Sequence, residues 1–506
     1  MTSSRLAHIT SVRGLAVVAF LLGGAVVLAY RPFSQTVRGD CAIYDYIAQS
    51  ILRGQMPYRD AIDPKAPAGM YFSAMAMAIG KSIGMRDVIA VRWLHVLMAA
   101  LLSAITFLVA EAYLRSRIAA LIAFLVPLLT DNFVLMMNKG TQPKLPMMVF
   151  GMLALLLMAK DSPFWAGLCS MMSCLCWQPG LMFAGAAFLI FSRYLTSWRD
   201  WRAAKVVAGA CVPLAVVLLY FYSRGALSDL WAWTITYSYT VFRPEGQKPF
   251  GQALAQLWKI SHREFGPDLV VAGLSLIGFA MYAVDRVRAR LKEGIRSMDL
   301  FRDGILFPPV VYFIFCIIDF QGGPDLIPFL PFLGLFAGWF LVEMGRVIAS
   351  SGFVKKSGPR IGLSSLAPTI ATFAILVLIL IRTTGYKPLN WGLREQDEAI
   401  GQIAAYLGPD DKIYVHGMAE ILVLLNRPNL NRYIALDSGA DDFIAAQKAG
   451  GFKDVIDEIE SATPKLVAIS RLRNVRHSKE LEQWVEVHYD ELELPGYETI
   501  YIRKQE

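Results

Sequence analysis

The chain has little charge and few cysteines for its length. Only 18% of its 506 residues are charged and 55% are hydrophobic, and the mean hydropathy is +0.45. Soluble proteins carry about 25% charged residues, so the composition excludes a disordered chain and an ordinary soluble enzyme. Five of the six cysteines lie in apolar runs, which excludes a disulfide scaffold. We therefore expect a polytopic membrane protein.

Two motifs are also missing. The sequence has no P-loop and no glycine-rich strand-to-helix turn, so no nucleotide site of the soluble type is indicated. No small-residue cleavage site follows the first apolar run, which we expect to be a retained anchor. The net charge of +8 comes from basic residues in short loops between apolar runs, where such residues set topology.

Eleven apolar runs approach the roughly 20 residues that a membrane-spanning helix requires. They are 15–30, 88–114, 118–137, 145–159, 164–177, 181–195, 206–222, 269–284, 305–318, 326–342 and 361–381. The shorter run 70–83 ends near Lys81 and is expected to lie in the interface. The basic loops, including 286–302, fall on one side of this arrangement. We interpret them as cytoplasmic, with contact to anionic lipid as an alternative for 286–302.

The composition changes after residue 382. Short strands predicted at 412–415, 433–436, 465–470 and 498–503 alternate with helices, which is typical of an α/β domain with a mostly parallel sheet. We therefore expect a transmembrane domain over 1–382, with an outer loop at 31–87. A soluble domain over 383–506, large enough to fold alone, is expected outside the membrane.

The outer loop 31–87 carries an unusual set of polar residues. Ile43, Ile47 and Ile51 recur at helical spacing and Gly54 follows, so a short amphipathic helix is predicted over 40–52. Asp40 then lies at the start of this helix. Aspartate at a helix start stabilises it as a cap by about 1 kcal/mol, but an acid this close to a bilayer is costly unless it pairs or acts chemically. Both interpretations stay open here.

Lys65 lies in the same loop, with Pro64 before it and Pro67 just after. It could be an interfacial lysine whose ammonium reaches water. Prolines restrict the backbone around it, which favours a positioned ammonium, the kind of group that a lipid phosphate requires.

The loop over 39–67 reads G-D-x-A-x-x-x-Y-I-A-x-x-I-L-x-G-x-x-P-Y-R-D-x-x-D-x-K-x-P. This pattern resembles bacterial members of the glycosyltransferase C superfamily, and within it the family 39 group of protein O-mannosyltransferases and lipid A aminoarabinose transferases. The resemblance implies a multi-span membrane domain, a catalytic acid in the first outer loop and a polyprenyl-phosphate sugar donor.

The resemblance also implies roles for single residues. Asp40 matches the general base, and Lys65 matches the lysine at the donor phosphate. Arg59 is a second candidate cation. The remaining expected pocket residues are Asp45, Tyr58, Asp60, Asp63, Asp131 and Lys144. Inverting sugar transfer needs one base on the acceptor and cations on the leaving phosphate, and these residue types meet both needs.

The chain departs from the family pattern in three places. Cys41 stands where an acid often follows the first one, loop 138–144 has no acid, and 321–325 lacks a His-Tyr pair. No metal ligands are therefore assigned, and the cofactor stays unknown, because the ligand spacing does not support a divalent cation. Asp40 and Asp45 could also form a carboxylate pair for hydrolysis.

Other candidates have ordinary explanations. His95 and His416 fit structural roles better than catalytic ones. The aromatic residues Trp231, Trp233, Tyr237 and Tyr239 fit an interfacial belt or a sugar-stacking surface.

The prediction is an inverting glycosyltransferase of the bacterial inner membrane with a cytoplasmic N-terminus and a periplasmic active site. Its partners would be a polyprenyl-phosphate-linked sugar, the bilayer, and a glycan, lipid or protein acceptor, with no nucleic acid. The alternative is a transporter or flippase of a lipid-linked saccharide, which would place charges or broken helices near mid-membrane. A non-catalytic scaffold is a third interpretation, but it leaves the polar loop without a role.

Overall fold

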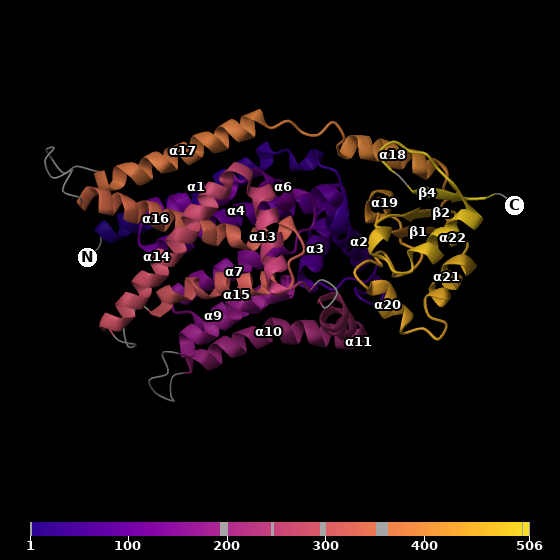
Figure 1. Ribbon diagram of the computed structural model, residues 1–506, viewed down its shortest axis with the longest axis horizontal. Coiled ribbons are helices and arrows are strands. Elements are labelled where there is room, and N and C mark those ends of the chain that lie inside the picture. The colour runs from indigo at the N-terminus through magenta and orange to yellow at the C-terminus, as the bar shows by residue number, and fades with distance from the viewer. Residues whose placement is uncertain are drawn as a thin grey trace.

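A computed structural model describes residues 3–192, 201–243, 247–293, 300–350, 363–497 and 499–504. The molecule is elongated (Figure 1). Long helices run roughly along its length, the N-terminus lies at one end, and a small sheet-containing unit with the C-terminus lies at the other. Several basic residues used for the topology lie outside the described residues: Arg193, Arg199, Arg296, Lys355, Lys356 and Arg360.

Every apolar run predicted to span the membrane is largely helical. The helices are α1 (Ser3–Ala29), α4 (Asp87–Leu114), α5 (Arg117–Leu129), α6 (Asp131–Asn138), α7 (Lys144–Ala159), α8 (Pro163–Cys176), α9 (Leu181–Ser192), α10 (Arg202–Ser223), α14 (Leu269–Glu293), α15 (Phe307–Ile318), α16 (Leu330–Ser350) and α17 (Leu363–Gly385). Seven helical segments of the described chain are long and apolar enough to cross a membrane, and α5 with α6 forms an eighth that bends by 71°. Helices α7, α8 and α9 are apolar but shorter. The total of eleven crossings stays a prediction.

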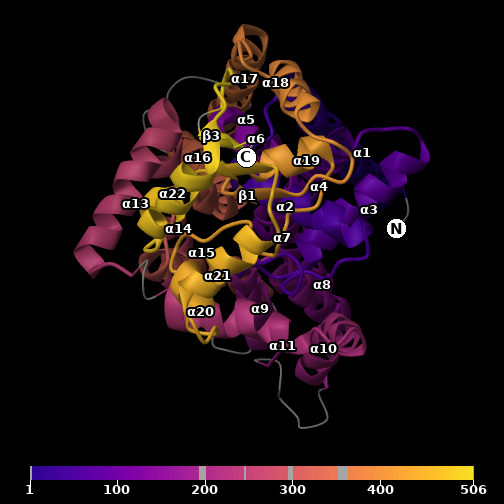
Figure 2. The same ribbon diagram turned by 90° about the vertical axis from the view of Figure 1, so that its right-hand side faces the viewer.

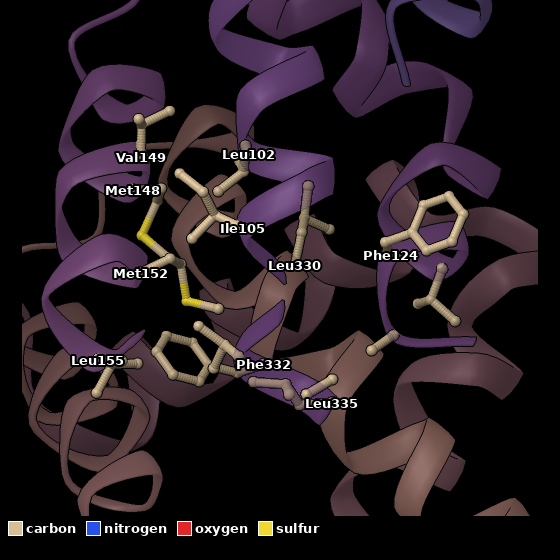
Figure 3. Close-up of a cluster of buried hydrophobic side chains, with 14 of the residues drawn as sticks. Leu102, Ile105, Phe124, Met148, Val149, Met152, Leu155, Leu330, Phe332 and Leu335 are labelled. Atoms are coloured by element: carbon tan, nitrogen blue, oxygen red, sulfur yellow. The ribbon is translucent and has the colours of Figure 1, made fainter. Parts of the chain in front are cut away.

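The bundle has an apolar core in which α4, α5, α7 and α16 meet. Figure 3 shows Leu102, Met152 and Leu335 among the side chains that fill it. Helices α5 and α16 approach closely because Gly334 lacks a side chain. A Cβ there would lie 2.0 Å from the carbonyl oxygen of Ala123. Small residues allow such close approach where helices pack in a membrane.

The outer segments form further helices. They are α2 (Gly39–Leu52), α3 (Ala68–Ser82), α11 (Leu227–Trp231), the π-helix η3 (Ala232–Phe242) and α13 (Phe250–Phe265). Helix α2 matches the predicted amphipathic helix, and Gly54 ends it with a φ of 83°, a conformation that glycine adopts at little cost.

The C-terminal unit is a mixed sheet, and the prediction of a mostly parallel one was wrong. The strands are β1 (Ile413–His416), β2 (Leu466–Ile469), β3 (Tyr489–Glu491) and β4 (Ile500–Arg503), in the order β1-β2-β4-β3. Only β1 and β2 are parallel; β4 is antiparallel to both β2 and β3. The helices are α18 (Leu393–Ala405), α19 (Ala419–Leu425), α20 (Ala440–Ala445), α21 (Phe452–Ser461) and α22 (Ser478–His488).

The predicted strand at 433–436 was also wrong. This segment has no strand partner in the described chain. Its apolar residues Ile434 and Leu436 are fully buried in irregular backbone, so the apolar run reflects burial without sheet pairing. The segment leads directly into α20 and places Asp437 next to the first outer loop.

The C-terminal unit is packed on the first outer loop. Figure 2 looks at this end of the molecule and shows α19 and β1 next to α2. Ile43 and Ile47 of α2 share one hydrophobic core with Ile421 and Leu422 of α19. The Gln396 side chain also bonds both backbone groups of Val37, at 2.7 and 2.8 Å. The loop is thus held between the membrane helices and the sheet unit.

Candidate active site

Two adjoining cavities of about 50 and 120 Å³ lie beside α2. Both are lined by Asp40, Pro64, Lys65, Phe242 and Gln321. The first extends toward the membrane helices, where its wall includes Lys144, Trp177, Arg243, Asp319 and Asp325. The second extends toward the C-terminal unit, where its wall includes Asp63, Trp233, Tyr237, Asp437 and Arg471. Asp40 and Lys65 therefore lie where the two cavities meet.

Asp40 is the second residue of α2, after Arg38 as N-cap and Gly39 as the first helical residue. Its carboxylate does not bond the helix amides; Oδ1 accepts a hydrogen bond from Arg471 over 3.2 Å. The structure therefore does not support a role for Asp40 as the cap of α2. The Asp40 side chain is 66% exposed. Desolvation by the surrounding protein raises its pKa, but the charges of Lys65, Arg471 and Lys144 outweigh this and hold the pKa below its usual value. The carboxylate is ionised and able to accept a proton.

Lys65 is held by its backbone. Its amide donates to Oδ1 of Asp63 over 2.7 Å, and its carbonyl accepts from the Tyr58 hydroxyl over 2.7 Å. The Nζ atom lies 5.1 Å from the centre of the Phe242 ring. Among the described residues the Lys65 ammonium has no ion pair, so it is available to an anionic ligand.

The other cations on the membrane side of the cavity are paired. Lys144 lies 3.3 Å from Asp325 and 4.3 Å from the centre of the Trp177 ring. Arg243 lies 3.8 Å from Asp319. Burial raises the pKa of Asp319.

The second outer loop, residues 138–144, positions Lys144. Asp45 accepts two hydrogen bonds from Thr141, from the amide over 3.0 Å and from the hydroxyl over 2.5 Å. The next amide, of Gln142, donates to Nε2 of His95 over 2.9 Å. These contacts fix the loop just before α7 begins. His95 is thus a structural residue, as its position in the sequence indicated.

The structure places several expected pocket residues elsewhere. Asp45 is fully buried on another face of α2, and Tyr58 is buried beneath Lys65. Arg59 pairs with Asp60 at 3.3 Å, and both line a separate hollow. Asp131 begins α6 and does not line the two cavities. Of the expected residues, the structure brings four together at these cavities: Asp40, Asp63, Lys65 and Lys144.

The aromatic residues 231–239 are divided between different environments. Trp233 and Tyr237 are buried and line the cavity next to the C-terminal unit. Tyr239 lines the other cavity beside Arg243, whose guanidinium lies 4.1 Å from its ring centre. Trp231 is 61% exposed and lines neither cavity.

Sequence reasoning missed five charged residues of the site: Arg243, Asp319, Asp325, Asp437 and Arg471. Asp319 follows an apolar span, and acids next to spans are a usable signal. No pattern linked Arg471 to a loop 431 positions earlier.

The described residues contain one group with potential metal-ligand spacing, and it is not at these cavities. Asp441, Asp442 and His477 each place one ligand atom within 4.8 Å of the others. His477 already has two protein partners, since it lies 3.3 Å from Asp442 and 2.9 Å from Glu480.

No family model and no curated protein matches this sequence. The structure is similar to ArnT from Cupriavidus metallidurans bound to undecaprenyl phosphate, with a TM-score of 0.59, 13% identity and 98% coverage of both chains. The apo form of the same protein matches with a TM-score of 0.60 at 12% identity. That match covers 99% of this chain and 98% of the apo ArnT chain.

An oligosaccharyltransferase from Archaeoglobus fulgidus, in complex with Zn and sulfate, gives a TM-score of 0.53 at 12% identity. The match covers 96% of this chain and 73% of the archaeal one. Identities this low establish the fold alone. The chain therefore shares the fold of these two proteins over nearly its whole length.

Proposed function

We propose that this protein is an inverting membrane glycosyltransferase that moves a sugar from a polyprenyl-phosphate donor to a glycan, lipid or protein acceptor on the outer face of the bacterial inner membrane. The observation that carries the proposal is the junction of the two cavities. An ionised carboxylate, Asp40, and the ammonium of Lys65, which has no ion pair within the part of the chain that the structure describes, both line it. The fold shared with ArnT, which has been crystallised with undecaprenyl phosphate, supports the choice of donor.

The donor phosphate fits the cavity on the membrane side. The wall there combines Lys65, Lys144 and Arg243 with Trp177 and Phe315. Charge-assisted contacts of this kind stabilise a phosphate that leaves as an anion. Lys65 would make the direct contact, because Lys144 and Arg243 already have carboxylate partners.

Asp40 would act as the base. It accepts the proton of the acceptor hydroxyl as that oxygen forms a bond to the anomeric carbon, while the bond from that carbon to the phosphate oxygen breaks and its electron pair leaves with the phosphate. This single displacement inverts the anomeric configuration and requires one carboxylate. Asp45 is buried and bonded to Thr141, so it does not form the carboxylate pair that the sequence had left open.

The transporter alternative has less support. A transporter places charges or broken helices near mid-membrane. Here one span is broken, α5 with α6, but the charged groups of the two cavities gather beside α2, next to the C-terminal unit. The proposed arrangement puts this unit in the periplasm and the N-terminus in the cytoplasm, and it treats 1–382 and 383–506 as the membrane and soluble domains.

The test uses purified protein in nanodiscs with a lipid extract containing polyprenyl-phosphate sugars. We expect release of polyprenyl phosphate that requires an added acceptor fraction and is inhibited by undecaprenyl phosphate. No release from any donor pool, together with movement of a lipid-linked saccharide across a proteoliposome membrane, would favour the transporter instead.

A further inference from the structure

We infer that Arg471, which the C-terminal unit supplies, is a positioning residue for Asp40, so that the catalytic site is complete only when this unit is docked on the first outer loop. The inference rests on the proposed function of Asp40. Its geometrical basis is the contact of Nη1 of Arg471 with Oδ1 of Asp40 over 3.2 Å. The two residues lie 431 positions apart.

Arg471 comes from a place in the sheet where site residues commonly occur. It follows β2 by two positions, and β2 is parallel to β1. Ligands in sheets with parallel strands bind beyond the carboxyl ends of those strands. Those ends are held together here, since Ser470 donates through its amide to His416 over 2.9 Å and through its hydroxyl to Gly417 over 3.1 Å.

The backbone at both ends of the contact is specialised. Arg471 has a φ of 60°, a left-handed conformation that non-glycine residues rarely adopt and that often marks functional sites. Gly39, next to Asp40, has a φ of 64°, and a Cβ there would lie 3.3 Å from Nη2 of Arg471. The glycine thus leaves room for the guanidinium against the first turn of α2.

The surroundings direct the Arg471 guanidinium toward Asp40. Asp437 and Glu420 are the other acids whose charges act on Arg471. Burial raises the pKa of both of them, that of Glu420 to about 7. The pKa of Asp40 is lowered instead, and Asp40 is the one of these three acids to which Arg471 donates a hydrogen bond.

The contact leaves one oxygen of Asp40 for chemistry. Oδ1 is held by Arg471, and within the described parts of the chain no group bonds Oδ2. An arginine that fixes one oxygen orients the other toward a hydroxyl in the cavity and keeps the carboxylate ionised until a proton arrives. Positioning of this kind matters because a misplacement of about 1 Å can slow a reaction by about 10²-fold.

The experiment measures sugar transfer in nanodiscs by the full-length protein and its Arg471→Ala and Arg471→Lys variants. Arg473→Ala is the matched control, because Arg473 is exposed on the same turn. We expect Arg471→Ala to lower kcat by tenfold to about 10²-fold with little change in donor KM, and Arg471→Lys to recover part of the loss. The acid limb of kcat/KM should move to higher pH in Arg471→Ala, since one of the cations that lower the pKa of Asp40 is gone.

Two results would overturn the inference. One is normal kcat in Arg471→Ala while Asp40→Asn is inactive, which leaves the proposed function standing. The other is that Arg471→Ala lowers kcat by the same factor in the Asp40→Asn variant as in the wild type. A residue that acts through Asp40 has no effect once the base is removed. If Asp40→Asn itself transfers sugar normally, the proposed function fails rather than this inference. Thermal unfolding and proteolysis of the C-terminal unit, unchanged in Arg471→Ala, exclude undocking as the cause.

Discussion

The hydroxyl of Tyr58 donates a hydrogen bond to the carbonyl oxygen of Lys65 over 2.7 Å. Tyr58 is fully buried and has a φ of 70°, so the turn 57–61 holds its ring beneath the lysine. The proline-flanked segment around Lys65 is thus positioned by a side chain seven residues earlier in the chain.

Tyr58→Phe is expected to weaken donor use without abolishing it. The change removes the donor and leaves a partly buried carbonyl unpaired, which costs about 1 kcal/mol. We expect a several-fold higher donor KM and a lower unfolding temperature, both measured in nanodiscs. Tyr222→Phe, at a 71% exposed position on α10, is the control. An unchanged donor KM in Tyr58→Phe would contradict this account of how Lys65 is held.

Lys65→Ala tests the donor contact itself. A charge-assisted hydrogen bond contributes about 1.5–3 kcal/mol, so donor use should fall tenfold or more. Lys65→Arg should retain part of it, because a cation remains. The exposed Lys81→Ala controls for the loss of a charge on the outer surface. If the rate of Lys65→Ala depends on donor concentration as the wild-type rate does, Lys65 does not bind the donor phosphate and is an interfacial lysine.

The sequence anticipated these residues to different degrees. The period of Ile43 and Ile47 predicted α2, and the pattern around Asp40 and Lys65 indicated the site, because both signals are local. Arg59 was assigned to the phosphate from its charge alone, but it pairs with Asp60 on the other side of the turn. The direction of a side chain within a loop depends on contacts that a sequence does not show.

The C-terminal unit shows the same limit. Its helices were largely predicted, because they depend on local periodicity. The sheet was not, because its strands of three to four residues carry no signal for their pairing direction. Ile434 was assigned to a strand from its apolar neighbours. It is buried, but in the described chain its segment pairs with no strand of the sheet. Arg471 reaches Asp40 only through docking of the whole unit.

Asp45 should make stability depend on pH. Burial raises its pKa from 3.8 to about 6, and a group with a raised folded-state pKa stabilises the fold below its unfolded-state pKa and loses that contribution as pH rises through the folded-state value. The difference corresponds to about 3 kcal/mol lost between about pH 4 and pH 6.

The Asp45→Asn variant removes this titration. Its advantage in unfolding temperature over the wild type should therefore be larger at pH 7 than at pH 4, as measured by thermal unfolding in detergent. Asn also retains an oxygen that can accept from Thr141, so transfer should continue. A constant difference across this pH range would mean that Asp45 is not the buried acid described here.

Topology can be measured with a reporter that is active only outside the cytoplasm. Fused after Glu506 it should be active, and inserted at positions 294–299 it should be silent. The reason is the positive-inside rule applied to the basic residues of 286–302. The opposite pattern would place Asp40 and the C-terminal unit in the cytoplasm and would contradict the proposed site of transfer.

The most direct measurement of the central claim is sugar transfer by Asp40→Asn, with Asp45→Asn as control. Removing a general base typically costs about 10²–10⁴ in rate. Asp40 makes no cap hydrogen bond in α2, so the variant should fold. We therefore predict that Asp40→Asn binds the polyprenyl-phosphate donor, because Lys65 is intact, and transfers sugar at least 10²-fold more slowly, whereas Asp45→Asn remains active. Normal transfer by Asp40→Asn would contradict the account, and loss of transfer in Asp45→Asn alone would move the base to the buried face of α2.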